Sequence, residues 1–354
     1  MSAAPLAQQE GPGVQSAVRP APVLSVRNLT TAIPGRRDAL VLVDDVSLAV
    51  GPGETLAIVG ESGSGKSMTF LSAIGLLPGG ARIVGGDVML EGQNLVTLGR
   101  EPLRRLRGTT IAMVFQDPLS GLNPVFPVGA QIAEVLRAHL PVSRSEARRR
   151  AIALLERVQI PDARRRVDDF PHQFSGGMRQ RVLIAMAIAL SPKVLIADEP
   201  TTALDVTVQA QILDLLADLQ AETGMALVLI THDLGIVARH ADHLAVMYGG
   251  RVVEEGSVDA VFGAAAHPYT VSLFRSVPHL EGDAGEPLRT IEGQPPSAGS
   301  RPPGCAFEPR CFLARGRQDC RTVRPDLAAT GSPGHRSACH HRDELGRSLA
   351  ETAG

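Results

Sequence analysis

The chain has 354 residues, of which 44% are hydrophobic, and a formal net charge of −2 at pH 7. This length predicts two or three structural units, and the apolar content excludes a wholly disordered chain. The near-neutral charge gives no global sign of nucleic-acid binding. No stretch approaches the roughly 20 apolar residues of a membrane-spanning helix, and residues 1–22 lack the pattern of a signal peptide. We therefore expect a cytoplasmic protein that reaches a membrane only through its partners.

The first third of the chain predicts a tail, a small antiparallel sheet and the start of an α/β core. Residues 1–22 are rich in Ala, Pro, Gly and Gln and are expected to be disordered. Two strand-like segments, 23–29 and 39–50, are separated by a Pro34–Gly35 turn. The next predicted elements are a buried strand at 54–59, a helix at 68–76, a short strand bracketed by Gly79–Gly80 and Gly85–Gly86, and a buried strand at 111–115.

The rest of the chain predicts a helical region, a second α/β segment and a C-terminal extension. The helical region spans about 118–178, and its arginine clusters near 144–150 and 164–166 are interpreted as solvated helix faces. Strands that alternate with helices imply a parallel sheet, with ligands at the C-terminal ends of its strands. From about residue 264 the composition turns rich in Pro, Gly and Arg, so we place a boundary there. The α/β elements predicted before it are helices at 182–190 and 206–220 and buried strands at 194–197, 226–230 and 245–248.

The segment Gly60-Glu61-Ser62-Gly63-Ser64-Gly65-Lys66-Ser67 fits G-x-x-x-x-G-K-[ST], the phosphate-binding P-loop. It lies between a predicted strand and a predicted helix, as the motif requires. Its glycines allow backbone N–H groups to wrap a phosphate, and the helix N-terminus adds partial positive charge. Lys66 can reach the terminal phosphates, and the Ser67 hydroxyl can ligate Mg²⁺. The sequence therefore predicts a nucleotide site here.

Polar side chains also follow three other predicted strands. Asp198 ends one apolar run and can hold the Mg²⁺ shell through water, and the adjacent Glu199 can polarise an attacking water. Gln116 and His232 come just after two further strands. Taken singly, each of these residues is more often an ordinary polar group at the edge of a core. Because parallel strands end at one edge of their sheet, we expect the four to lie together beside the P-loop.

A second helix N-terminus suited to anions is predicted at Ser175-Gly176-Gly177, before a helix that starts near Met178. Alone, this segment is equally an ordinary capped helix start. Two such N-termini more than a hundred residues apart suggest ATP clamped between two surfaces.

These motifs occur in the order typical of the nucleotide-binding domain of ABC transporters, and the resemblance covers about residues 23–262. It implies an α/β P-loop ABC ATPase domain with a parallel-sheet core, a small antiparallel β subdomain and an α-helical subdomain. The segments that resemble the Walker A, Q-loop, signature, Walker B, D-loop and H-loop motifs are Gly60–Ser67, Gln116, Phe174–Met178, Leu195–Pro200, Ala203–Asp205 and Thr231–Asp233.

The resemblance also implies a role for each motif. ATP in this family lies between two domains arranged head to tail, so Ser175, Gly176 and Gly177 would contact the nucleotide on the partner's P-loop. The other implied roles are catalytic base for Glu199, γ-phosphate contact and water positioning for His232, Mg²⁺ contact and relay to the membrane partner for Gln116, and communication across the dimer for Asp205.

Two positions depart from the family pattern. Met178 follows the signature glycines where Gln is commoner, and Ile33 stands where an aromatic residue usually stacks on adenine. Apolar contact from Ile33 alone implies weak nucleotide affinity or base selectivity.

The C-terminal region narrows the resemblance to one branch. Phe174–Arg181 and Thr201–Gln211 resemble the D-type ATPase of dipeptide and oligopeptide importers, and His267–Thr270 with Pro302–Cys311 resemble the extension of the peptide/nickel branch. We therefore expect an ABC ATPase domain at 23–263, with its helical subdomain at about 118–178, an extension at 264–345 and a tail at 346–354.

All four cysteines lie in the last fifty residues, at Cys305, Cys311, Cys320 and Cys339. In a reducing cytosol, clustered cysteines bind metal more often than they form disulfides. Their spacings fit neither a zinc ribbon nor the bacterial ferredoxin run, and four thiolates suit a [4Fe–4S] cluster or a zinc ion. Family members with this extension carry an iron–sulfur cluster, so the resemblance implies [4Fe–4S], with zinc and unligated cysteines as alternatives. Phe312 stands where the family usually has Pro.

The resemblance implies an ATPase that powers import of di- or oligopeptides, or of a nickel or opine-type solute. Its partners would be a second, distinct ABC ATPase subunit, two permease subunits docking near 119–128 at the cytoplasmic face of the cell membrane, and indirectly an extracytoplasmic solute-binding protein; no nucleic acid is expected. The alternative from another class is a soluble ABC ATPase of DNA maintenance, which would carry a coiled coil or a zinc module inside its core. The intact Glu199 and His232 argue against an iron–sulfur regulator with a vestigial ATPase.

Overall fold

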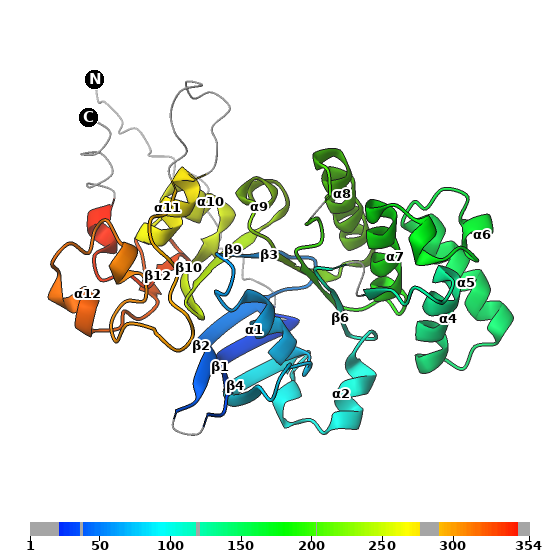
Figure 1. The fold of residues 1–354 in the computed structure, drawn as a ribbon, viewed down its shortest axis with the longest axis horizontal. Coiled ribbons are helices and arrows are strands. Elements are labelled where there is room, and N and C mark those ends of the chain that lie inside the picture. The colour runs from blue at the N-terminus through cyan, green and yellow to red at the C-terminus, as the bar shows by residue number, and fades with distance from the viewer. Residues whose placement is uncertain (1–20, 36–37, 118–120, 203, 277–289, 346–354) are drawn as a thin grey trace, which may run out of the picture.

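The computed structural model describes residues 21–35, 38–117, 121–202, 204–276 and 290–345. The expected tails at 1–22 and 346–354 lie almost wholly outside these residues, as do Ala203 and Leu119. A central sheet runs through the molecule, with the helical region at one end and the C-terminal extension at the other (Figure 1). A second, antiparallel sheet lies against its middle.

The antiparallel sheet has the strand order β2-β1-β4-β5 in the described residues, which confirms the predicted antiparallel subdomain. Its strands are β1 (Leu24–Ile33), β2 (Leu40–Val50), β4 (Arg82–Leu90) and β5 (Gln93–Asn94).

The expectation that Gly85–Gly86 ends a short strand is wrong, because β4 runs through both glycines. Gly86 has a φ of 86°, and a Cβ there would lie 2.4 Å from the carbonyl oxygen of Asn28 in β1. The glycine lets the two backbones approach where their pairing shifts register.

The central sheet has the order β11-β12-β10-β9-β3-β8-β7-β6 and is parallel from β9 to β6. All residues of β3, β7 and β8 are buried, as expected for parallel strands covered on both faces. The parallel strands are β3 (Thr55–Val59), β6 (Ile111–Val114), β7 (Val194–Asp198), β8 (Ala226–Ile230) and β9 (His243–Tyr248), and β10 (Arg251–Ser257) pairs antiparallel with β9.

Helices cover both faces of the central sheet. The first helix, α1 (Lys66–Ala73), shares a core with β1, β2 and β4, and therefore packs between the two sheets. The other helices around the sheet are α2 (Arg100–Leu106), α8 (Val206–Thr223), α9 (Leu234–His240) and α10 (Val258–Gly263), with a 3-10 turn at Leu95–Thr97.

The helical region comprises α4 (Val128–His139), α5 (Arg144–Arg157), α6 (Ala163–Arg166) and α7 (Gly176–Ile188), with a 3-10 turn at Pro171–Gln173. Its arginines form exposed ion pairs such as Arg148–Asp168 (2.6 Å) and Arg150–Glu146 (2.7 Å), as predicted for solvated helix faces.

The extension is joined to the ATPase core by strand pairing and by an aromatic cluster. Its strand β12 (Arg336–Ser337) pairs with β10 and with β11 (Ala328–Ala329). Phe307 packs edge-on and Tyr269 packs at a tilt against Tyr248 of β9, with ring centroids 5.2 and 4.6 Å away. The helical pieces of the extension are α11 (Pro268–Arg275), a 3-10 turn at Glu308–Arg310 and α12 (Gln318–Thr322). Within the described residues, no helix has the length and apolar character needed to cross a membrane.

Candidate functional site

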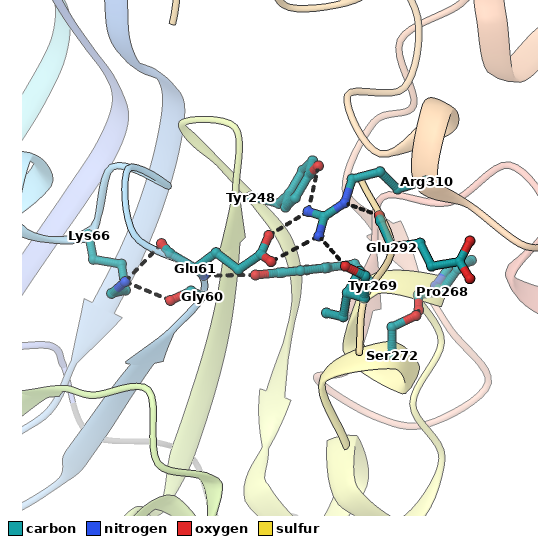
Figure 2. A network of polar contacts seen from close by, with 10 residues as sticks. Gly60, Glu61, Lys66, Tyr248, Pro268, Tyr269, Ser272, Glu292 and Arg310 are labelled. Atoms are coloured by element: carbon teal, nitrogen blue, oxygen red, sulfur yellow. Dashed lines mark hydrogen bonds and ion pairs between the residues drawn. The ribbon is translucent and has the colours of Figure 1, made fainter. Parts of the chain in front are cut away.

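The P-loop is held in a conformation that requires glycine at both ends. Gly60 has a φ of 150°, and a Cβ there would lie 2.2 Å from the carbonyl oxygen of Met247. Gly65 adopts the left-handed conformation as the N-cap of α1. Lys66 opens that helix, and its Nζ donates to the carbonyl oxygens of Gly60 (2.6 Å) and Glu61 (3.1 Å), so it folds back over the loop (Figure 2). Burial lowers the pKa of the Lys66 ammonium, and the nearby Glu199, Asp198 and Glu61 partly offset this.

Ser67 and Asp198 meet beside the P-loop. The P-loop follows β3 and Asp198 ends β7, and these two parallel strands are separated in the sheet only by β8. The Ser67 hydroxyl donates to Asp198 Oδ1 at 3.0 Å. Asp198 is buried, and burial raises the pKa of its carboxyl. A hydroxyl and a carboxylate in contact form the oxygen-rich ligand set that Mg²⁺ prefers.

Glu199 is the meeting point of three polar side chains. It has a φ of 47°, unusual for a residue other than glycine, and its N–H donates to the Ile230 carbonyl at 2.9 Å. Its Oε2 accepts hydrogen bonds from Gln116 Nε2 at 2.7 Å and Thr202 Oγ1 at 2.8 Å. His232 Nδ1 lies 3.6 Å from the same oxygen. The structure thus brings Gln116, Glu199 and His232 together.

Thr202 is a contact that sequence reasoning missed. It lies three residues beyond Glu199 in a turn closed by a 3.2 Å bond from its own N–H to the Glu199 carbonyl. The only signal in the sequence is that Thr202 lies three residues after the predicted catalytic Glu199. This spacing does not show that the turn brings the Thr202 hydroxyl to the carboxylate.

The signature residues and Asp205 cap two neighbouring helices. Ser175 Oγ accepts from the N–H of Met178 at 3.3 Å at the start of α7, and Asp205 Oδ1 accepts from the N–H of Val208 at 2.9 Å at the start of α8. A Cβ on Gly177 would lie 2.4 Å from a methyl group of Val208, so the two helices touch here. In the described part of the chain, neither cap has a hydrogen bond to the P-loop. Ser175 and Gly176 are exposed.

Ile33 ends β1 and pairs with Leu40 of β2, with its side chain partly exposed. Its expected role at the adenine stays a prediction.

The four cysteines line one small cavity in the extension, together with Phe307, Leu313 and Pro325. Burial raises the pKa of all four thiols, to about 11 for Cys305 and about 12 for Cys339. Among the described residues, one group of three potential metal ligands, Asp319, Cys320 and His341, has its ligand atoms within 4.8 Å of one another.

Comparison with known proteins places the chain in a family. Residues 43–202 match the family described as ABC transporter, and residues 253–320 match the one described as oligopeptide/dipeptide transporter, C-terminal region. A protein of Brucella melitensis whose name assigns it to peptide import as an ATP-binding protein is 50% identical over 92% of this chain and 98% of its own length. The chain belongs to the ABC transporter family. Another such protein, from Brucella abortus, is 50% identical over 92% of this chain and 96% of its own.

Solved structures of ABC proteins match the ATPase part of this ABC protein. A dimeric ATP-binding cassette in a post-hydrolysis state with ADP and Pi has a TM-score of 0.60 and 28% identity, over 66% of this chain and 98% of that one. A subunit of an ABC transporter complex from Clostridium perfringens has a TM-score of 0.58 and 30% identity, over 68% and 91% of the two chains. The predicted α/β ABC ATPase fold with a transporter-type C-terminal region is therefore confirmed, and the chain is an ATP-hydrolysing ABC protein.

Proposed function

We propose that this chain powers the import of di- or oligopeptides, or of a related solute such as a nickel or opine-type compound. The match of residues 253–320 to the oligopeptide/dipeptide transporter C-terminal region supports this, as do the names of relatives aligned over 92% of the chain. We further propose the division into an ATPase domain at 23–263, with a helical subdomain at about 118–178, and an extension at 264–345. A DNA-maintenance ATPase is disfavoured, because the longest helix among the described residues between Gln116 and Ser175 has 14 residues and the cysteines lie outside the core.

The proposed chemistry is attack of water on the γ-phosphate of ATP. The N–H groups of the Gly60–Ser67 loop and the Lys66 ammonium bind the phosphates. Ser67, Asp198 and Gln116 would hold Mg²⁺, which supplies charge neutralisation for the transferring phosphoryl group when bound. Glu199 accepts the proton of the attacking water, and His232 contacts the γ-phosphate.

The observation that best supports Glu199 as the catalytic base is the set of side chains around its Oε2. Two donors, Gln116 Nε2 at 2.7 Å and Thr202 Oγ1 at 2.8 Å, converge on the oxygen of a carboxylate at the edge of the sheet that bears the P-loop. Hydrogen bonds of this kind hold the carboxylate in one orientation.

Glu199→Gln tests the assignment. We expect it to retain ATP binding and to lose turnover by at least about a hundredfold, because an amide cannot accept the proton. Glu222→Gln is a matched control, since Glu222 only makes an exposed pair with Arg157. Steady ATP hydrolysis by Glu199→Gln at a near wild-type rate would remove Glu199 from this role.

We propose that one chain holds half of each ATP site. Ser175 and Gly176 are exposed, and Val206 beside Asp205 is 83% exposed, which leaves these helix starts open to a partner. Ser175, Gly176 and Gly177 would contact ATP on the P-loop of a second ABC ATPase subunit, distinct from this one, and Asp205 would communicate between the two. The isolated chain should therefore hydrolyse ATP slowly and accelerate when its companion ATPase and permeases are added.

We propose that two permease subunits dock beside the Q-loop, at the cytoplasmic face of the cell membrane, and connect the chain indirectly to an extracytoplasmic solute-binding protein. Apolar side chains are exposed here, with Phe115 at 41%, Val125 at 69% and Phe126 at 54%. An adjoining groove between α1, β6 and α7 is lined largely by apolar residues. Val125→Asp should weaken assembly with the permeases without changing ATP binding by the isolated chain.

We also propose that Cys305, Cys311, Cys320 and Cys339 hold a [4Fe–4S] cluster, with zinc as the alternative. The four thiols face one cavity, and the set fits a four-thiolate site.

The buried thiols must release their protons to bind metal, so binding should weaken as the pH falls. The cluster, when bound, would add covalent cross-links to a segment that has few apolar residues. Anaerobically purified protein should contain iron and sulfide, and Cys305→Ser should lose both. A colourless protein with one zinc per chain would contradict the cluster.

A further inference from the structure

Arg310 of the extension reaches across to the P-loop (Figure 2). Its Nη1 donates to Glu61 Oε2 at 2.6 Å and its Nη2 donates to Glu61 Oε1 at 3.0 Å. This is the two-pronged geometry in which guanidinium and carboxylate bind most specifically. The Arg310 side chain is only 4% exposed, so water scarcely competes for the pair.

The remaining N–H groups of Arg310 fix its position. Nε donates to the Glu292 carbonyl at 2.8 Å, Nη2 to the Ile291 carbonyl at 3.1 Å and Nη1 to the Tyr248 hydroxyl at 3.2 Å. A guanidinium has five N–H groups, and these bonds together with the two to Glu61 use five. The guanidinium therefore has one supported orientation, and that orientation faces Glu61.

A second residue of the extension holds the same P-loop residue from its backbone. The Tyr269 hydroxyl accepts a hydrogen bond from the Glu61 N–H at 2.8 Å. Tyr269 is fully buried, and its ring packs against Tyr248 and Phe307. The side chain and the N–H of Glu61 are thus both bound by residues outside the ATPase core.

Glu61 in turn contacts the lysine that binds phosphate. Its carbonyl accepts from Lys66 Nζ at 3.1 Å, beside the Gly60 carbonyl at 2.6 Å. The chain of contacts Arg310–Glu61–Lys66 therefore leads from the extension to the phosphate-binding ammonium. Without Arg310, the Glu61 carboxylate would be left unpaired within the phosphate-binding loop, and its negative charge would repel the phosphates.

We propose that Arg310 is a positioning residue for ATP. It acts through Glu61 in two ways, by neutralising a carboxylate beside the phosphate site and by fixing the first turn of the P-loop. The extension is then part of the nucleotide site and sets its affinity for ATP. Arg310 does not touch the reacting atoms, so its effect falls on binding rather than on the chemical step.

The test is a double-mutant cycle on the full chain, with Mg-ATP binding measured by titration and KM and kcat measured in the assembled transporter. We expect Arg310→Gln to raise the Kd and KM for ATP about tenfold and to change kcat less than about twofold. Glu61→Gln/Arg310→Gln should bind ATP more tightly than Arg310→Gln alone, because the unpaired carboxylate is gone. Arg317→Gln is the control, since Arg317 makes a similar two-pronged pair with Glu344 in the same extension.

The cycle separates positioning from mere stabilisation of the fold. A purely structural role predicts that the double variant is no better than Arg310→Gln, and that outcome overturns the proposal. An unchanged Kd in Arg310→Gln overturns it as well. Should Arg310→Gln fail to fold, Arg310→Lys replaces it, since lysine keeps the charge but lacks the fork. With Glu61 present, Arg310→Lys should raise the Kd for ATP by less than the tenfold expected for Arg310→Gln. Combined with Glu61→Gln, Arg310→Lys should leave the Kd of the Glu61→Gln variant unchanged.

Discussion

Glu254 is a fully buried carboxylate that ties two separate segments of the extension to β10. Its Oε1 accepts from the Ala266 N–H at 2.6 Å, and its Oε2 accepts from the His267 N–H at 3.0 Å, just before α11. His335 Nε2 lies 2.8 Å from Oε1, one residue before β12. We predict that Glu254→Gln destabilises the chain severely and releases the extension first.

The magnitude follows from the contacts that the amide cannot make. A glutamine keeps one acceptor oxygen and presents an N–H₂ group where a backbone N–H needs an acceptor. Each hydrogen bond to a charged group is worth about 1.5 to 3 kcal/mol, and a buried donor left without a partner adds to the cost. An unsatisfied buried donor costs about 1 to 3 kcal/mol, so we expect a total loss of about 3 to 5 kcal/mol in the free energy of unfolding.

The next residue on the same strand is a matched control. Glu255 pairs with Arg336, also in the extension, but both side chains are partly exposed. Such surface pairs contribute about 0 to 1 kcal/mol, so Glu255→Gln should be nearly neutral.

Urea unfolding curves and limited proteolysis measure the difference. Glu254→Gln should shift the unfolding midpoint far more than Glu255→Gln does, and should make the chain after β10 sensitive to protease at concentrations the wild type resists. Equal shifts for the two variants would refute the argument that burial and three converging donors make Glu254 the anchor.

Three further predictions follow from other contacts. Burial lowers the pKa of His267 to about 3 from 6.5, so between these values the unfolded chain binds one more proton than the folded chain. The free energy of unfolding therefore falls by about 1.4 kcal/mol for each unit by which the pH is lowered. His267→Asn should lose less stability between about pH 7 and about pH 5 in urea unfolding. Gly86→Ala should lower the melting temperature more than Gly92→Ala, because both have φ near 80° but only a Cβ at Gly86 meets another backbone. Chelation of metal from the reduced protein should weaken ATP binding in a nucleotide titration, since Arg310 directly precedes Cys311, and an unchanged Kd would show that the two sites are independent.

Much of the ATPase core could be predicted from the sequence because its signals are local. Strands such as β3 and β8 are unbroken apolar runs, and their burial on both faces follows from that pattern. The P-loop and the acidic end of β7 are short motifs whose chemistry depends on neighbouring residues. The rule that parallel strands end at one edge then placed Gln116 and His232 near Glu199.

The features that could not be predicted depend on segments far apart in the chain. The glycine at position 86 looks like a strand end, and only the approach of β1 shows that it lies within β4. The start of α7 lies before the apolar run that predicts a helix, because Ser175 caps it. Arg310 is one of many arginines in the sequence, and nothing local indicates a partner 249 positions away.

The position of Glu61 explains why an extension poor in apolar residues can belong to a nucleotide site. Glu61, the second residue of the P-loop, is partly exposed, as loop backbone that must stay open to phosphate requires. On one side the loop is continuous with β3, whose Val59 packs in the same core as Tyr248, Tyr269 and Phe307. On the other side the only charged group that fixes Glu61 within the described residues comes from the extension. The aromatic core and the ion pair therefore act together. The aromatic core fixes the position of the extension relative to the sheet, and the Arg310–Glu61 pair then holds the loop. A change in the extension that shifts Phe307 should reach Lys66 through Arg310 without altering any residue of the ATPase motifs.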